Sequence, residues 1–170
     1  MHVLAATEEG VYGSSDGGEQ WTAAGLTDLG VRVIVQDPHD AKKFWAGTEQ
    51  SGVFCSSNGG TKWEQRSAGL DHPTVYTIAV HPTKPDWIYI GTYGGGVYRS
   101  SDGGAGWQQC SRGLVDHQVH SLIILPSDPQ TMLAGTLNRG LFRSIDGGES
   151  WRFDSHGESQ VWGLSVRPEK

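Results

Sequence analysis

The stretch Ser14-Ser15-Asp16-Gly17-Gly18-Glu19-Gln20-Trp21 decides the fold, because the chain contains three more copies of it with few changes. The other copies run from Ser56 to Trp63, from Ser100 to Trp107 and from Ser144 to Trp151. The four tryptophans that end these copies are separated by 42, 44 and 44 residues. This spacing matches the length of a four-stranded propeller blade, so the sequence predicts an all-β chain with one blade per repeat.

Each repeat contains four short segments with the composition of β-strands. The first segments are rich in β-branched residues and apolar on both faces, as in a strand buried from both sides. They are residues 31–35, 75–80, 119–124 and 161–166. The second segments are residues 3–7, 43–48, 87–92 and 131–136, and the third are residues 10–12, 52–56, 96–99 and 140–143. A fourth strand begins at each tryptophan, so each repeat is predicted to be an antiparallel meander.

The chain length of 170 residues suits a single domain, residues 1–170. The repeats cover residues 31–74, 75–118 and 119–160 approximately, and a split repeat joins residues 161–170 to residues 1–30. The chain therefore opens on a second strand and ends on an isolated first strand. We expect these two terminal strands to complete one shared blade, which would remove two exposed sheet edges.

Two ways of closing the ring fit this pattern. One chain can close on itself as a four-bladed ring, which the small residues Ser121, Gly163 and Ser165 would permit. Alternatively, two chains exchange terminal strands and form an eight-bladed homodimer. The compact repeats and the lack of a disulfide or metal staple favour the dimer, which is the preferred alternative.

Charge and composition exclude several classes of partner. The formal net charge is −6, and no basic cluster is longer than Lys42-Lys43. We therefore expect neither nucleic acid nor a membrane surface as a partner. The cysteines, Cys55 and Cys110, occupy non-equivalent positions and are expected to be free thiols. No long apolar run or signal-peptide pattern is present, so we expect a cytoplasmic protein, or a secreted one if a leader was removed.

The pattern Ser-x-Asp/Asn-Gly-Gly-x-x-Trp resembles the Asp-box or BNR repeat of sialidases, sortilin-type receptors and photosystem II assembly factors. The resemblance covers essentially the whole chain and implies a β-propeller. It leaves the activity open, because these relatives include hydrolases, receptors and chaperone-like factors. The box residues expected to be structural are Ser14, Asp16, Gly18, Trp21, Ser56, Asn58, Gly60, Trp63, Ser100, Asp102, Gly104, Trp107, Ser144, Asp146, Gly148 and Trp151.

The chemistry of the box is that of a self-sufficient turn. Its Ser and Asp side chains can accept hydrogen bonds from turn N–H groups, and its glycines tolerate positive φ. The Trp can anchor the following strand in a pocket. A calcium site is disfavoured because Asn58 replaces the acid in the second copy and no second acidic ligand recurs at a fixed offset. We expect no metal and no cofactor.

One position differs in every repeat and is the candidate ligand-binding site. It follows the identical residues Val31, Val75, Val119 and Val161, and it is occupied by Arg32, Tyr76, His120 and Trp162. If these side chains point toward the axis, they would line its mouth with a cation, a phenol, an imidazole and an indole. The alternative is drift of the repeats where packing is loose.

Catalytic residues are not predicted. The loops before the first strands carry Asp28, Asp71-His72, Asp116-His117 and His156 with Glu158, but none shows a recognised metal-ligand spacing. Arg99 and Arg143 occupy equivalent positions and are expected to face outward, although such a pair can also clamp a carboxylate. The expected function is a non-enzymatic binding or assembly scaffold for a protein or glycan ligand. The alternative is a glycan-binding or glycoside-hydrolase-like protein.

Overall fold

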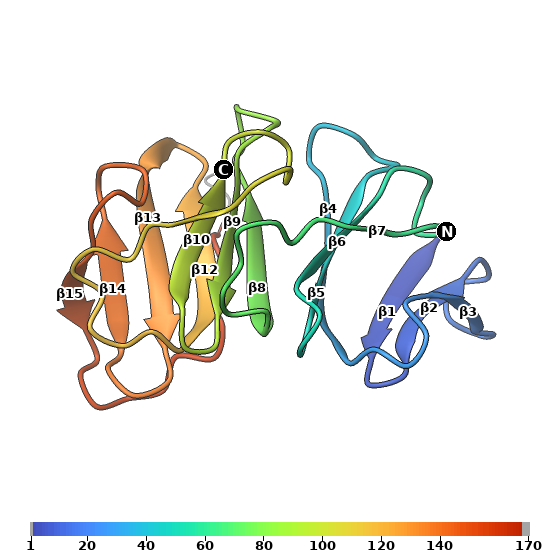
Figure 1. Cartoon of the computed structure of the whole chain (residues 1–170), viewed down its shortest axis with the longest axis horizontal. Helices are drawn as coiled ribbons and strands as arrows, with labels where there is room; N and C mark the ends of the chain where they lie inside the picture. The colour runs from blue at the N-terminus through green and yellow to red at the C-terminus, as the bar shows by residue number, and fades with distance from the viewer. Residues whose placement is uncertain (1, 168–170) are drawn as a thin grey trace.

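The computed structural model describes residues 2–167, and all of its regular elements are β-strands (Figure 1). Fifteen strands follow one another along the chain, joined by turns. Their bounds are β1 (Val3–Thr7), β2 (Gly10–Ser14), β3 (Thr22–Gly25), β4 (Val31–Gln36), β5 (Phe44–Thr48), β6 (Val53–Ser56), β7 (Glu64–Gln65), β8 (Val75–Val80), β9 (Ile88–Thr92), β10 (Gly96–Ser100), β11 (Gln108–Gln109), β12 (Val119–Leu125), β13 (Asp128–Thr136), β14 (Leu141–Ser144) and β15 (Arg152–Ser155).

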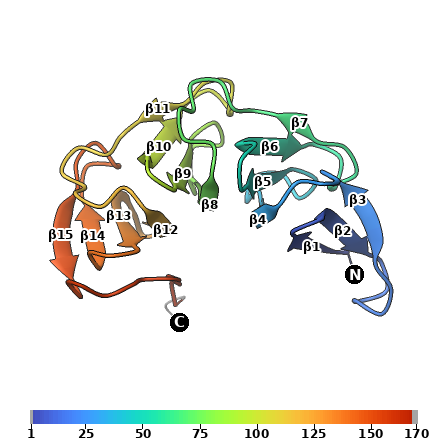
Figure 2. The ribbon, with the colours of Figure 1, turned by 60° about the horizontal axis from the view of Figure 1, so that its bottom comes forward.

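The strands form four antiparallel sheets, which we call blades 1 to 4. Blade 1 contains β1, β2 and β3, and blades 2, 3 and 4 contain β4–β7, β8–β11 and β12–β15. Within each blade, neighbours in sequence are neighbours in the sheet, as in a meander. Figure 2 shows the blades side by side along an arc, with β4, β8 and β12 on its inner side. The predicted all-β propeller with four blades is therefore confirmed.

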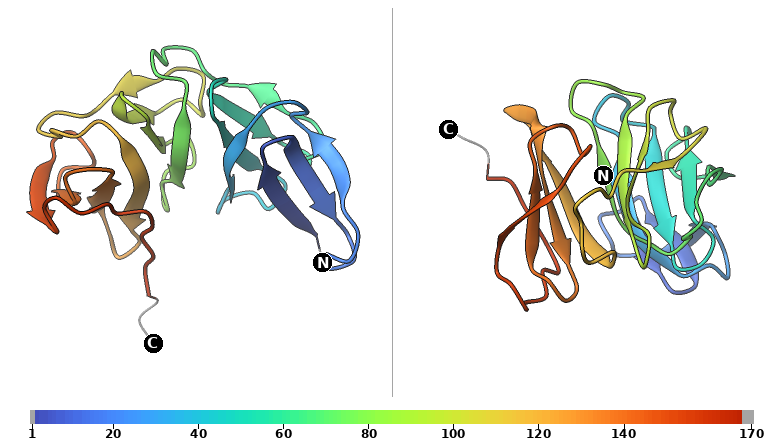
Figure 3. Two further views of the ribbon diagram at one scale, coloured as in Figure 1. Left: turned by 90° about the horizontal axis from the view of Figure 1, so that it is seen from below. Right: turned by 60° about the vertical axis from the view of Figure 1, so that its left-hand side comes forward.

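The predicted strand 161–166 is wrong as an element of the single chain. Val161 is held against blade 4, since its N–H donates to the Thr136 carbonyl (3.0 Å) and its carbonyl accepts from the Ser121 hydroxyl (3.1 Å). Beyond it, the segment joins no sheet of the described residues. The reason is the open arc, which separates this segment from β1 (Figures 2 and 3).

One chain therefore does not close into a four-bladed ring, and blade 1 has three strands. Residues 168–170 of the split repeat lie outside the described residues, and the repeat boundaries stay predictions. No helix among residues 2–167 is long and apolar enough to cross a bilayer.

Three hydrophobic cores lie between adjacent blades. The core between blades 3 and 4 joins Tyr89 and Val97 to Phe142 and Trp151, all of them buried. Similar clusters join blades 2 and 3 and blades 1 and 2. Burial of this apolar surface is the main favourable term that holds the arc together. The blades are thus structural units that need a neighbour to cover their faces.

Glycines allow the blades to approach closely on the inner side. A Cβ built at Gly47 would lie 2.7 Å from a methyl group of Val75, and one at Gly91 would lie 2.6 Å from a methyl group of Val119. Each of these valines begins the first strand of the next blade. The absence of a side chain at Gly47 and Gly91 therefore sets how closely the inner strands pack.

Candidate binding site

A β-bulge lies near the start of each inner strand. In blade 2, Val31 pairs with Thr48 and Val33 pairs with Gly47, so Arg32 has no partner of its own in the register. The same shift leaves out Tyr76 in blade 3 and His120 in blade 4. A bulge re-aims the side chain of the extra residue. The position that differs in every repeat is therefore also the position that the backbone sets apart.

The structure brings all four predicted site residues into one continuous row. The Arg32 guanidinium carbon lies 5.8 Å from the centre of the Tyr76 ring. The ring centroids of Tyr76 and His120 are 4.3 Å apart and the rings are stacked. The His120 and Trp162 rings meet edge to face at 4.9 Å. Side chains 42 to 44 residues apart thus form a single aromatic surface that begins with a cation.

His120 lies at the centre of the row and has unused hydrogen-bonding capacity. Its Nε2 atom is buried, and no hydrogen-bond partner is found for it in the described residues. Burial lowers the pKa of His120; the nearby Asp116 carboxylate acts in the opposite direction, and Arg32 lowers the pKa further. A neutral imidazole is therefore favoured near pH 7. According to the tautomer, Nε2 is a donor or an acceptor that the described residues leave without a partner.

Two residues of the loops between the second and third strands extend the row. The Glu49 carboxylate accepts a hydrogen bond from the Arg32 guanidinium (2.6 Å), and both side chains are close to half exposed. Tyr93, which is 49% exposed, meets Tyr76 edge to face at 6.1 Å. The sequence alone assigned neither residue to the site. Their equivalent positions, after the shared Thr48 and Thr92, are the signal that connects them.

Asp116 lies near His120 and is held by backbone N–H groups. One of its carboxylate oxygens accepts from the Gln118 N–H (3.1 Å) and the other from the Asn138 N–H (2.7 Å). Asp116 is 7% exposed, so its charge is held inside the loop cluster that leads into β12. The Gln118 Oε1 atom is buried and, like His120 Nε2, has no partner among the described residues. Gln118 is a residue that the sequence alone did not single out.

The remaining loop residues do not gather into a chemical site. His72 packs against the turn Gly94-Gly95, and the hydroxyl of Ser155 lies 2.8 Å from Nδ1 of His156. Asp28 and Glu158 occupy left-handed backbone positions, with φ of 63° and 62°. Among residues 2–167, no group of three or more His, Cys, Asp or Glu side chains is arranged to hold a metal ion.

The box residues lie on the opposite rim from the row and satisfy one another. In every copy the first serine is buried, and its hydroxyl accepts from the N–H of the second glycine at 2.8 to 2.9 Å. The same hydroxyl donates to the Asp or Asn side chain at 2.7 to 2.9 Å. That side chain accepts further N–H groups of the turn, and Asn58 does so with Thr61 and Lys62. The hydrogen bonds to Asp16 lower the pKa of its carboxyl group, and the bond from Ser14 has the largest effect.

Arg99 and Arg143 are engaged with carboxylates of the chain itself. The Arg99 guanidinium donates to Glu149 at 2.5 Å and lies over the ring of Trp87. Arg143 donates through Nε to Asp154 at 2.8 Å. Each arginine therefore has its own carboxylate, and the two do not act as one clamp. The expectation that both face outward was incomplete for Arg99, because its partner Glu149 lies in the neighbouring blade.

The fold and the row together define a β-propeller protein with a polar-aromatic surface on its inner side. No family model and no curated protein matches the sequence. Solved structures match the fold: an ancestral GH74 enzyme (24% identity, TM-score 0.75, 91% of this chain and 22% of that chain) and the GH74 xyloglucanase from Xanthomonas campestris (21%, 0.72, 88% and 28%). YCF48 bound to a D1 peptide also matches (19%, 0.62, 89% and 48%).

These similarities show the fold alone, because all three identities are below 25%. The chain spans between 22% and 48% of the length of these structures. Active-site and ligand contacts of the larger proteins are therefore not transferred to this chain, and its function is argued from its own residues.

Proposed function

We propose that this chain is a non-enzymatic binding or assembly module built from Asp-box repeats, and that it binds its ligand on the row Arg32, Tyr76, His120 and Trp162. The observation that carries the proposal is that four equivalent positions with four different side chains form one contact surface. A structural role alone would be met by similar residues in each repeat, as at the adjacent valines. Different side chains on a shared scaffold are instead typical of a recognition surface.

The chemistry of the row suits a peptide. Trp162 is 63% exposed and offers a flat apolar face, and Tyr93 offers a second one. The ion pair of Arg32 with Glu49 is exposed, so it contributes little to stability and can exchange for a ligand carboxylate. The solved structure of YCF48 with a bound D1 peptide supports a peptide ligand by analogy of fold.

Catalysis is not favoured by the carboxylates near the row. Glycoside hydrolysis commonly needs two carboxyl groups that are available to the substrate. Glu49 is paired with Arg32, and both oxygens of Asp116 accept backbone N–H groups. Asp116 is thus held by the backbone, which leaves no pair of free carboxylates among the residues of the row.

Glycan binding is the second candidate function. The exposed ring faces of Trp162 and Tyr93 could stack on a sugar as readily as on a peptide side chain. The similarity of the fold to GH74 enzymes supports this candidate by analogy. Self-association through the terminal strands is also part of the proposal. It is supported by β1, whose outer edge has no partner strand among residues 2–167.

The test is a binding screen of peptides and oligosaccharides against the wild-type chain and three variants. We expect Tyr76→Ala and Trp162→Ala each to weaken a genuine ligand by about tenfold or more, as for an aromatic hot spot. Ile145→Ala is the matched control, because Ile145 is 58% exposed and lies in the fourth box, away from the row. A ligand that binds all four proteins equally would show that the row is not the site.

A further inference from the structure

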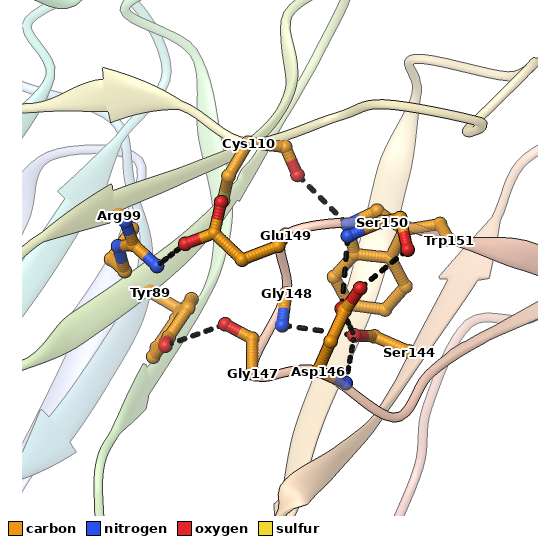
Figure 4. Close-up of polar contacts among 10 residues, drawn as sticks. All are labelled: Tyr89, Arg99, Cys110, Ser144, Asp146, Gly147, Gly148, Glu149, Ser150 and Trp151. Atoms are coloured by element: carbon orange, nitrogen blue, oxygen red, sulfur yellow. Dashed lines mark hydrogen bonds and ion pairs between the residues drawn. The ribbon is translucent and has the colours of Figure 1, made fainter.

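The contact between blades 3 and 4 shows how one blade recognises the next (Figure 4). Nε1 of Trp151 in blade 4 donates to the carbonyl of Cys110 in blade 3 at 2.8 Å. The Tyr89 hydroxyl donates to the carbonyl of Gly147 at 2.9 Å. Arg99 of blade 3 forms an ion pair with Glu149 in the box of blade 4. This junction combines an indole anchor with a charge pair.

The indole anchor recurs at every junction within the chain. Nε1 of Trp63 donates to the Ala24 carbonyl at 3.0 Å, and Nε1 of Trp107 donates to the Arg66 carbonyl at 2.7 Å. Trp21 belongs to blade 1, before which residues 2–167 contain no other blade, and its Nε1 donates to the carbonyl of Gly18 in its own box. Trp21 is 42% exposed, whereas Trp107 and Trp151 are each 4% exposed. Blade 1 therefore displays an anchor without a receiving blade.

The free face of blade 1 has the composition of an internal junction. Ala5, Tyr12 and Trp21 line a hollow of about 620 Å³ on this face. The residues equivalent to them in the other blades all belong to the cores between blades. These are Ala46, Phe54 and Trp63 in blade 2, Ile90, Tyr98 and Trp107 in blade 3, and Ala134, Phe142 and Trp151 in blade 4.

The charge pattern identifies which blade fits this face. The position of Arg99 is occupied by Gly13 in blade 1, Cys55 in blade 2 and Arg143 in blade 4. The box position of Glu149 is occupied by Glu19, Thr61 and Ala105 in blades 1, 2 and 3.

Within the chain, the junctions then combine Gly13 with Thr61, Cys55 with Ala105, and Arg99 with Glu149. The residues left over are Arg143 of blade 4 and Glu19 of blade 1, which have opposite charge. The present contact of Arg143 with Asp154 uses Nε, so its terminal nitrogens can serve a second acceptor.

The C-terminal segment is already placed as the first strand of a following blade. A Cβ at Gly135 would lie 2.5 Å from a methyl group of Val161, the same close approach as between Gly47 and Val75. The only sheet neighbour of β1 in the described residues is β2, so its other edge is open. Figure 3 shows that β1 and this segment lie at opposite ends of the arc and do not meet within one chain.

We propose that blade 4 and residues 161–166 of one copy pack against blade 1 of a second copy, with Arg143 paired to Glu19, and that two copies close a ring of eight blades. Two reciprocal junctions related by a two-fold axis close such an assembly. Trp162 then lies in the same blade as β1 of the second copy, beside Arg32 of that copy, so the row continues from one copy to the other. This interface rests on the self-association proposed above, and it does not depend on what the row binds.

The experiment measures mass in solution by light scattering over a dilution series. We expect wild type to have twice the 18.4 kDa mass of one chain. Glu19→Arg and Arg143→Glu each place like charges at both junctions, so each should raise the dimer dissociation constant roughly a hundredfold, about tenfold per junction. An equimolar mixture of the two variants should recover the dimer, because one junction is then native and the other has its charges exchanged.

Every outcome of these mass measurements either supports or overturns the eight-bladed dimer. Folding of both variants is checked by circular dichroism, and the double variant Glu19→Arg/Arg143→Glu should be dimeric by itself. A wild-type mass of one chain at every concentration would overturn the interface, and a mass above two chains would overturn closure by two copies. If single variants stay dimeric, or if mixing them recovers nothing, Arg143 and Glu19 do not meet. Thr61→Arg, at the equivalent position of an internal junction, is the control and should leave the mass unchanged.

Discussion

The imidazole of His120 lies stacked on the phenol ring of Tyr76, with centroids 4.3 Å apart and planes inclined by 16°. The two residues come from adjacent repeats and occupy the extra position of equivalent bulges. Neither ring would be covered in an isolated blade. The stack is therefore a property of the arc, and it couples the titration of one residue to the presence of the other.

We expect Tyr76→Ala to raise the pKa of His120 toward its ordinary value of about 6.5. Burial is the main cause of the lowered pKa, and removal of the stacked ring exposes the imidazole to water. Titration of the histidine resonances by NMR in the variant and in wild type measures the change. An unchanged His120 pKa in this variant would mean that the stack does not contribute to its burial.

The same lowered pKa makes folding sensitive to acid. The unfolded chain binds a proton at His120 more readily than the folded chain, so this stabilisation is complete above about pH 6.5. It is lost as the pH falls through the folded pKa. Burial also lowers the pKa of His81, which adds to the effect. Urea unfolding at a series of pH values should show a smaller acid loss in His120→Gln than in wild type, and equal losses would contradict this account.

Ser100→Ala should cost about 1–2 kcal/mol of unfolding free energy, because it leaves the buried N–H of Gly104 without its acceptor. The neighbouring Ser101 is exposed, and Ser101→Ala is the matched control. Asp102→Asn should be tolerated, since Asn58 already fills this position in the second box. Urea denaturation of the three variants tests the turn, and a severe loss in Asp102→Asn would show that the charge is required.

Removal of a box tryptophan should have different effects in different blades. Trp107→Ala should destabilise the chain by about 3–5 kcal/mol, because a buried indole between two blades is lost. Trp21→Ala should cost much less at concentrations where the chain is monomeric, since this indole is largely uncovered. Thermal unfolding of dilute samples compares them. Equal losses would mean that Trp21 is buried in the monomer.

The thiol of Cys110 should resist labelling in the folded chain. Burial raises its pKa to about 12, while the thiolate is the reactive form. In the Cys55→Ala variant, reaction with a disulfide reagent should therefore follow unfolding as urea is added. The converse Cys110→Ala variant, which keeps the half-buried Cys55, provides the comparison. Fast labelling of Cys110 without denaturant would contradict its buried position.

The sequence predicts those parts of the fold that depend on interactions between residues close together in the chain. The Ser and Asp side chains of a box satisfy the N–H groups of their own turn, so Ser100 to Trp107 predicts this turn without any knowledge of other blades. Strand periodicity is equally local. The row could be predicted in part from the sequence, because four identical valines align the four varied positions. These are Val31, Val75, Val119 and Val161. Gln118 and the charge pairs could not be predicted, since nothing near them in the sequence indicates their partners.

The sequence by itself therefore determined the blades, their number and the place of the varied residues, because these depend on short-range turn chemistry and on the repeat period. The tertiary structure decided what lies across a blade junction: the contact of His120 with Tyr76, the pairing of Arg99 with Glu149, and the separation of residues 161–166 from β1. These relations depend on the angle between successive blades. That angle is set by packing between segments about 44 residues apart, which no local pattern encodes.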